Sequence, residues 1–144
     1  MKSLINIEFL TKKQITNLVD LANNFKLSDG TFVQESIYPD KTVGALFFEP
    51  STRTKLSFEI AALNLGARFI DFDCSQSSLK KGESIKDTIE TISLMGVDTL
   101  IIRSKEELFE DLINDLPNIN FINAGQGILS LSLIHISEPT RHDQ

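Results

Sequence analysis

The stretch TVGALFFEPSTRTKLSFEIAALNLGA, residues 42–67, decides the fold. It begins with a short, nearly all-apolar run over residues 42–48, which is typical of a strand buried on both faces of a parallel sheet. Pro50 ends this strand because proline cannot donate to the ladder of hydrogen bonds. Apolar residues then recur at helical spacing, which predicts a helix near residues 53–65 with Gly66 as its C-terminal stop.

The rest of the chain continues this alternation of strand and helix. Apolar and amphipathic runs predict strands near residues 42–48, 68–72, 98–102 and 119–123, and helices near residues 53–65, 84–95 and 105–115. Upstream, an apolar stripe over residues 15–25 predicts a further helix that Thr11 and Gln14 begin as a capping box, and Ser104 with Glu107 repeats this pattern. Because right-handed crossovers place helices on both sides of a parallel sheet, the sequence predicts an α/β fold with a parallel sheet of about four strands and helices on both faces.

Hydroxyls and a guanidinium gather at the predicted start of the helix that follows Pro50. They belong to Ser51, Thr52, Arg53 and Thr54. Backbone N–H groups are free at a helix N-terminus, and with a bidentate guanidinium they suit a phosphate. The same pattern would arise if Ser51 were only an N-cap and Arg53 only a solvated surface charge, since N-cap serines are common. An oxyanion site and a simple helix cap are therefore both open.

Ligands of parallel sheets bind at the carboxyl ends of the strands, so the turn after Phe48, the loop after Phe72 and Arg103 are predicted to meet at one crevice. Taken alone, Arg103 is a surface charge that pairs with a neighbour such as Glu106, a contact worth about 0–1 kcal/mol. By composition, residues 74–82 form a polar, solvated loop, although loops carry a large share of binding residues.

Composition excludes several classes of partner. The 144-residue chain has 14 Lys and Arg against 20 Asp and Glu, a net charge of −6, so an anionic ligand needs a local basic group, and neither nucleic acid nor a membrane is expected as a partner. We expect a cytoplasmic protein without disulfides, because no apolar run is long enough to span a membrane and Cys74 is the single cysteine. No histidine or second cysteine lies near Cys74, so we interpret it as a packed thiol and expect no metal site.

The string FFEPSTRTKLSFEIAALNLGA, residues 47–67, resembles the carbamoyl-phosphate signature of the aspartate and ornithine transcarbamoylases. Three further segments resemble the aspartate members of this family, in the same order. They are SSLKKGESIKDT at residues 77–88, VDTLIIRS at 97–104 and INAG at 122–125. The ornithine enzymes lack the KGES loop. The resemblance implies that residues 1–130 form a carbamoyl-phosphate-binding domain.

The resemblance implies a role for each residue that matches the family's motifs. Ser51, Thr52, Arg53 and Thr54 would bind the phosphate, and Thr54 and Arg103 would polarise the carbonyl of carbamoyl phosphate. Arg53, Thr54 and Arg103 would form the catalytic set. A preorganised donor of this kind contributes about 3–4 kcal/mol to lowering the barrier.

The resemblance also implies a site that is shared between subunits. The loop residues Ser77 and Lys81 match those that reach into the neighbouring subunit's active site, with Ser78 as a register alternative for Ser77. The full-length protein is therefore expected to be a homotrimer.

The implied reaction belongs to pyrimidine biosynthesis and is an acyl transfer. The α-amine of L-aspartate attacks the carbamoyl carbon, and phosphate leaves to give N-carbamoyl-L-aspartate without a cofactor or a metal. The rate would come from placement and electrostatics. In the family, a second domain binds aspartate and an HPTQ segment shares the carbonyl contact, and both are missing from this sequence.

The resemblance stops shortly after Gly125. Residues 131–141 resemble the translation of a sequencing adapter, so residues 131–144 are expected to be a non-natural tail, with a divergent natural C-terminus as the alternative. Both histidines, His135 and His142, lie in this tail. The resemblance therefore implies an incomplete first domain without an aspartate-binding domain, and negligible carbamoyl transfer by this 144-residue chain. A free-standing α/β module that binds phosphorylated ligands without catalysis is the alternative function.

Overall fold

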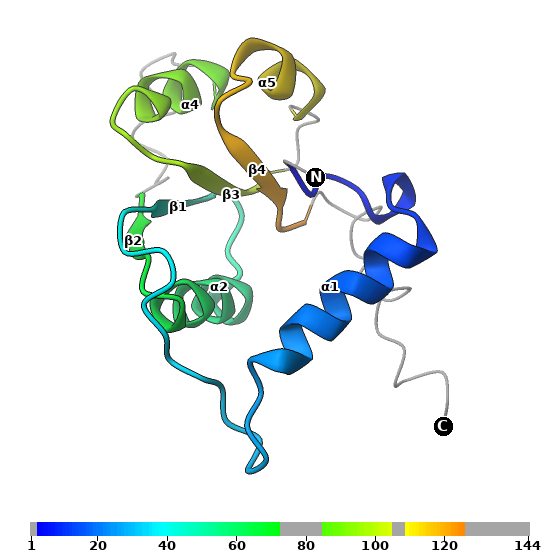
Figure 1. The fold of residues 1–144 in the computed structure, drawn as a ribbon. Coiled ribbons are helices and arrows are strands. Elements are labelled where there is room, and N and C mark those ends of the chain that lie inside the picture. The colour runs from blue at the N-terminus through cyan, green and yellow to red at the C-terminus, as the bar shows by residue number, and fades with distance from the viewer. Residues whose placement is uncertain (1–2, 73–84, 105–108, 126–144) are drawn as a thin grey trace.

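The structure of the protein is a computed structural model, which describes residues 3–72, 85–104 and 109–125 (Figure 1). Its strands are β1 (Thr42–Phe47), β2 (Arg68–Asp71), β3 (Thr99–Arg103) and β4 (Asn120–Asn123). Its helices are η1 (Ile7–Phe9), α1 (Lys12–Asn24), α2 (Thr52–Asn64), α4 (Ile85–Ser93) and α5 (Phe109–Asp115). The strands pair in parallel in the order β2-β1-β3-β4, which confirms the predicted α/β class.

The order in which the chain adds strands to the sheet changes side at β1. It leaves β1 through α2 to reach β2 on one side, and then returns to β3 on the other side of β1. As a result α2 lies against one face of the sheet, whereas α4 and α5 lie against the other (Figure 1). The topological switch point, where open α/β sheets bind their ligands, is therefore between the carboxyl ends of β1 and β3.

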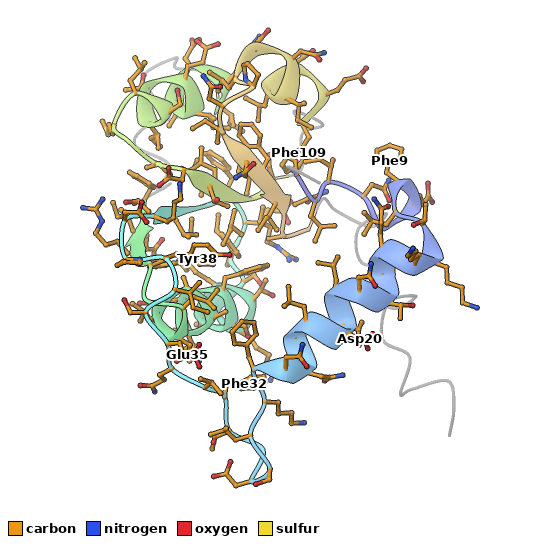
Figure 2. The ribbon with its side chains drawn as sticks, viewed as in Figure 1. Phe9, Asp20, Phe32, Glu35, Tyr38 and Phe109 are labelled. Carbon is orange, nitrogen blue, oxygen red and sulfur yellow. The ribbon has the colours of Figure 1, made fainter. Side chains whose placement is uncertain are left out.

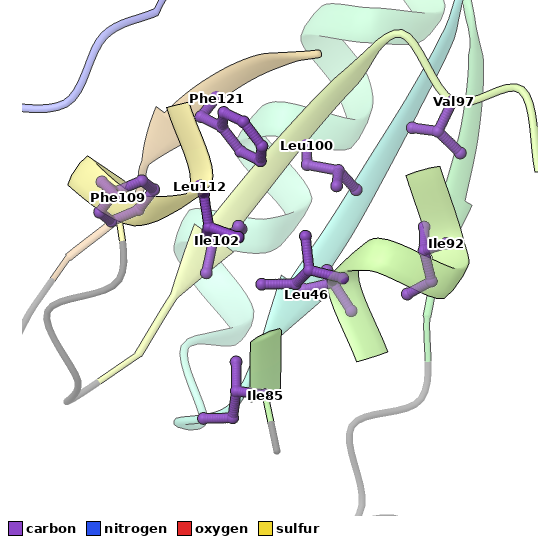
Figure 3. Packing of buried hydrophobic residues seen from close by; sticks show 10 residues of the cluster. Leu46, Ile85, Ile92, Val97, Leu100, Ile102, Phe109, Leu112 and Phe121 are labelled. Atoms are coloured by element: carbon purple, nitrogen blue, oxygen red, sulfur yellow. The ribbon is translucent and has the colours of Figure 1, made fainter. Parts of the chain in front are cut away.

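The main hydrophobic core lies between the sheet and the α4 and α5 layer. Leu46, Leu100 and Ile102 point from the sheet toward this layer, and Ile92 and Leu112 meet them from the helices (Figure 3). Burying a side chain of this size completely contributes about 1.5–3 kcal/mol. This core therefore fixes the backbone of β1 and β3 up to the residues that precede their carboxyl ends.

The opposite face is covered less completely. The side chains of Leu56, Ile60 and Leu63 on α2 are 50%, 57% and 55% exposed, and α1 has no buried residue. An apolar groove of about 520 Å³ lies between the two helices, and Phe32, on the connection that follows α1, is one of its walls (Figure 2). The predicted helices are thus present on both faces, but one face retains an open apolar surface.

Local signals set the helix ends as predicted. In the capping box of α1, the N–H of Gln14 donates to Thr11 Oγ1 at 3.1 Å and the N–H of Thr11 donates to Gln14 Oε1 at 2.9 Å. Gly66 follows α2 with φ of +79°, a conformation that favours glycine. In the second predicted capping box, Glu107 lies outside the described residues. Among the described residues, no helix is long and apolar enough to cross a membrane.

Candidate functional site

The N-terminus of α2 follows directly from the carboxyl end of β1. The N–H of Lys55 donates to the Ser51 carbonyl at 3.0 Å, so Ser51 is the N-cap by its backbone, yet its side chain accepts no capping hydrogen bond. Thr52 and Arg53 are exposed, Ser51 and Thr54 are half-buried, and the first turn carries no acidic side chain. The first turn therefore offers its hydroxyls and its positive dipole end without an internal counter-charge.

Lys55 is a further cation in this turn, but its charge is already compensated. Its Nζ lies 3.1 Å from Asp71 Oδ2 at the end of β2 and 5.9 Å from the centre of the Phe47 ring. These contacts tie α2 to the sheet. Arg53, by contrast, has its side chain in solvent.

Arg103 lies beside the turn that leads to α2. It is the last residue of β3, whereas the sequence predicted that it would follow the strand, because its backbone pairs with Phe47 and its carbonyl accepts the N–H of Phe48 at 2.8 Å. Its side chain is only 14% exposed, and its Nη1 donates to the Ala124 carbonyl at 2.9 Å. The guanidinium thus lies at the switch point, between the carboxyl ends of β1, β3 and β4.

A carboxylate partners this guanidinium at long range. Glu49 Oε2 lies 3.8 Å from Arg103 Nε, and the Glu49 side chain is 18% exposed. Both Glu49 Oε1 and Arg103 Nε are buried and have no hydrogen-bond partner among the described residues. A buried charge is stable only when it is paired and hydrogen-bonded, so this loosely bonded guanidinium has donor capacity for an anionic or carbonyl oxygen.

The structure places five of the candidate residues at the side of the sheet where the strands have their carboxyl ends. They are Ser51, Thr52, Arg53, Thr54 and Arg103. The loop candidates Ser77 and Lys81, and the register alternative Ser78, lie outside the described residues.

Two residues beside Arg103, Glu49 and Gly125, had no role predicted from the sequence. Glu49 belongs to the quoted turn motif and Gly125 ends the INAG segment, so their positions beside the motif residues were the available signal. The sequence suggested Glu106 as the partner of Arg103, and Glu106 lies outside the described residues.

Comparison with known proteins agrees with this geometry. The family described as "Aspartate/ornithine carbamoyltransferase, carbamoyl-P binding domain" matches residues 2–130. The chain belongs to this family. The resemblance of its turn and strand motifs to the aspartate and ornithine transcarbamoylases is thereby confirmed.

Similar members of this carbamoyltransferase family are catalytic subunits of aspartate carbamoyltransferase. The one from Staphylococcus epidermidis is 42% identical over 127 residues, which are 88% of this chain and 42% of that protein. Among solved structures, the catalytic subunit of aspartate transcarbamoylase from M. jannaschii superposes with a TM-score of 0.80 at 33% identity, over 99% of this chain and 47% of that one.

The Trypanosoma cruzi aspartate transcarbamoylase, solved in complex with aspartate and phosphate, gives a TM-score of 0.75 at 30% identity, over 88% of this chain and 41% of that one. The carbamoyltransferase chain described here therefore spans less than half the length of these relatives.

Proposed function

We propose that residues 1–130 form the carbamoyl-phosphate-binding domain of an aspartate carbamoyltransferase, which makes N-carbamoyl-L-aspartate and phosphate for pyrimidine biosynthesis. One observation carries the proposal. The first turn of α2 follows the carboxyl end of β1, and Arg103 ends the neighbouring strand β3, so both segments lie at the switch point of a parallel sheet. Membership of the carbamoyltransferase family supports the choice of ligand.

In this mechanism the first turn of α2 holds the phosphate. The hydroxyls of Ser51, Thr52 and Thr54, the guanidinium of Arg53 and the free N–H groups of the turn donate to its oxygens. This places negative charge at the positive end of the helix dipole. It also stabilises the additional charge that the phosphate takes on as it leaves.

The carbamoyl carbonyl would lie against Arg103 and Thr54. When the aspartate amine attacks the carbamoyl carbon, a C–N bond forms and the carbonyl oxygen becomes negative, and donors already in place stabilise this oxyanion. The C–O bond to phosphate then breaks, and phosphate takes the electron pair and the proton that the amine releases. No side chain becomes covalently attached.

We further propose that the full-length protein is a cytoplasmic homotrimer in which Ser77 or Ser78 and Lys81 complete the site of the neighbouring subunit. Aspartate binding belongs to a second domain. Both statements rest on the resemblance to the aspartate members of the family.

A matched pair of arginine substitutions tests the proposed ligand. Arg53→Ala is expected to weaken carbamoyl phosphate binding at least about tenfold, since hydrogen bonds to a charged group contribute about 1.5–3 kcal/mol. Arg68→Ala removes another exposed arginine, at the first residue of β2 and hence at the opposite edge of the sheet, and should leave the affinity unchanged.

Calorimetric titration with carbamoyl phosphate measures both variants, and urea denaturation should show stabilities within about 0.5 kcal/mol of the parent. Equal affinities for the folded Arg53→Ala and Arg68→Ala proteins would show that the turn does not hold the ligand. Absence of carbamoyl phosphate binding by the parent chain would remove the proposed function itself.

A further inference from the structure

The guanidinium of Arg103 occupies the space that a side chain at position 125 would need. Its Nη1 donates to the Ala124 carbonyl, and a Cβ built on Gly125 would lie 2.5 Å from Nη1 and 3.0 Å from Cζ. The first distance is shorter than Cβ atoms approach other atoms in folded proteins. The arginine and any residue larger than glycine therefore compete for one position.

The backbone beneath the guanidinium is held in place and has little freedom to retreat. The N–H of Gly125 donates to Asn123 Oδ1 at 3.0 Å, and Asn123 Nδ2 donates to the Ile5 carbonyl at 3.0 Å. The N–H of Ala124 donates to the Ile102 carbonyl at 2.8 Å, which extends the pairing of β3 and β4. A side chain at position 125 would therefore displace the guanidinium in preference to the backbone.

Displacement of the guanidinium would also disturb its contact with Glu49. Glu49 Oε2 lies 3.8 Å from Arg103 Nε, so the planar group is held between this carboxylate and the Ala124 carbonyl. An arginine donates effectively only when its planar fork faces the acceptor. Its direction therefore depends on all three neighbours, Glu49, Ala124 and Gly125.

We propose that Gly125 is a positioning residue for Arg103. By having no side chain, Gly125 lets the guanidinium lie on the Ala124 carbonyl and face the N-terminus of α2. The inference rests on the proposed function for the ligand that Arg103 meets, but the contact between the two residues can be measured without any ligand.

Backbone strain has to be separated from this contact, because Gly125 has φ of +134° and any other residue is strained there. Gly96 supplies a matched control. Its φ is +87°, but a Cβ built on it meets nothing within 4 Å. Gly96→Ala therefore introduces a comparable kind of strain without touching Arg103.

A double-mutant cycle tests the proposal on the 144-residue chain. Gly125→Ala and Gly96→Ala are each made with Arg103 present and in an Arg103→Ala background, and the urea midpoint of each protein is measured. We expect Gly125→Ala to lower the midpoint clearly more with Arg103 present than in the Arg103→Ala background. Gly96→Ala should lower it equally in both. Equal losses from Gly125→Ala in the two backgrounds would overturn the proposal, because the glycine would then serve only its own backbone.

Calorimetry with carbamoyl phosphate supplies the functional arm of the same cycle. With Arg103 present, Gly125→Ala should weaken binding about tenfold, the equivalent of one hydrogen bond to a charged group. In the Arg103→Ala background it should weaken binding no further. A stability coupling without an affinity coupling would show that Gly125 packs against Arg103 without positioning it for the ligand. If the parent chain binds no carbamoyl phosphate, the proposed function fails, and the stability arm still decides whether Gly125 sets the place of Arg103.

Discussion

Among the described residues, Thr11 and Ser51 each precede a helix, and their structures predict opposite effects of removing the hydroxyl. Thr11 Oγ1 accepts the N–H of Gln14 at 3.1 Å in the capping box of α1. Ser51 stands in the same place at α2, but its side chain accepts no capping hydrogen bond. The pair Thr11→Ala and Ser51→Ala therefore compares a hydroxyl that caps its helix with one that caps no helix N–H and that we propose binds the ligand.

The magnitudes follow from these contacts. Losing an N-cap hydrogen bond costs about 1 kcal/mol, which corresponds to about fivefold faster exchange of the amides that the helix protects. Thr11→Ala should therefore accelerate hydrogen exchange in α1 by about this factor, and Ser51→Ala should leave exchange in α2 nearly unchanged. The effects of the two substitutions on ligand affinity should be the reverse. Ser51→Ala should weaken carbamoyl phosphate binding about tenfold, and Thr11→Ala should leave it unchanged.

Native-state hydrogen exchange read by NMR and calorimetric titration supply the two measurements. Exchange is the suitable assay because α1 has no buried residue, so its opening need not follow global unfolding. Fivefold faster exchange in α2 together with an unchanged affinity in Ser51→Ala would refute the reasoning. Ser51 would then be an ordinary helix cap, which is the simpler interpretation that the sequence left open.

Two further predictions concern the fold. Gly66→Ala should lower the urea midpoint more than Gly30→Ala. Both glycines have positive φ, but a Cβ on Gly66 would lie 2.6 Å from Ser36 Cα, whereas a Cβ on Gly30 meets nothing within 4 Å. Equal losses of stability would show that only the backbone strain matters. Ile60→Gln should reduce the fluorescence of a bound hydrophobic dye, because Ile60 lines the apolar groove. Leu94 follows α4 and is 88% exposed, and Leu94→Gln should leave the fluorescence unchanged. Equal dye binding by both variants would show that the dye does not bind in the groove.

The sequence predicted those parts of the fold that depend on neighbours along the chain. The strands followed from apolar runs because β1 is covered on both faces, with Ala45 and Leu46 both buried on successive sides of the strand. The start of α1 followed from the Thr11 and Gln14 spacing, and the end of α2 from Gly66. Each of these signals lies within a few residues of the feature it sets.

The strand order and the contacts around Arg103 depend on residues far apart in the chain. The apolar run of residues 99–102 does not predict that β3 pairs with β1. Arg103 belongs to the strand because its backbone pairs with Phe47. The role of Gly125 depends in turn on where the Arg103 side chain points. Periodicity and turn chemistry report neither of these facts, because both arise only when the sheet assembles.

The apolar groove shows a different limit of the sequence. The helical spacing of apolar residues correctly predicts that α1 and α2 are helices, but it does not predict what packs against them. Ile60 and Leu63 remain more than half exposed, whereas Ile89 on α4 is completely buried, although all three have helical spacing. Amphipathicity states which side of a helix avoids water, and only the assembled chain decides whether that side is covered.

The two faces of the sheet consequently relate to the candidate site in different ways. Leu46 and Ile102, each at most 1% exposed, immediately precede the paired residues Phe47 and Arg103, so the α4 and α5 core fixes the backbone on which the guanidinium and the turn to α2 are placed. Electrostatic stabilisation of an oxyanion requires donors that are already in position. A change in this core should therefore alter stability and ligand affinity together. A polar change in the groove, such as Ile60→Gln, acts on the outer surface of α2 and should leave the edge formed by Arg103 and the first turn of α2 in place.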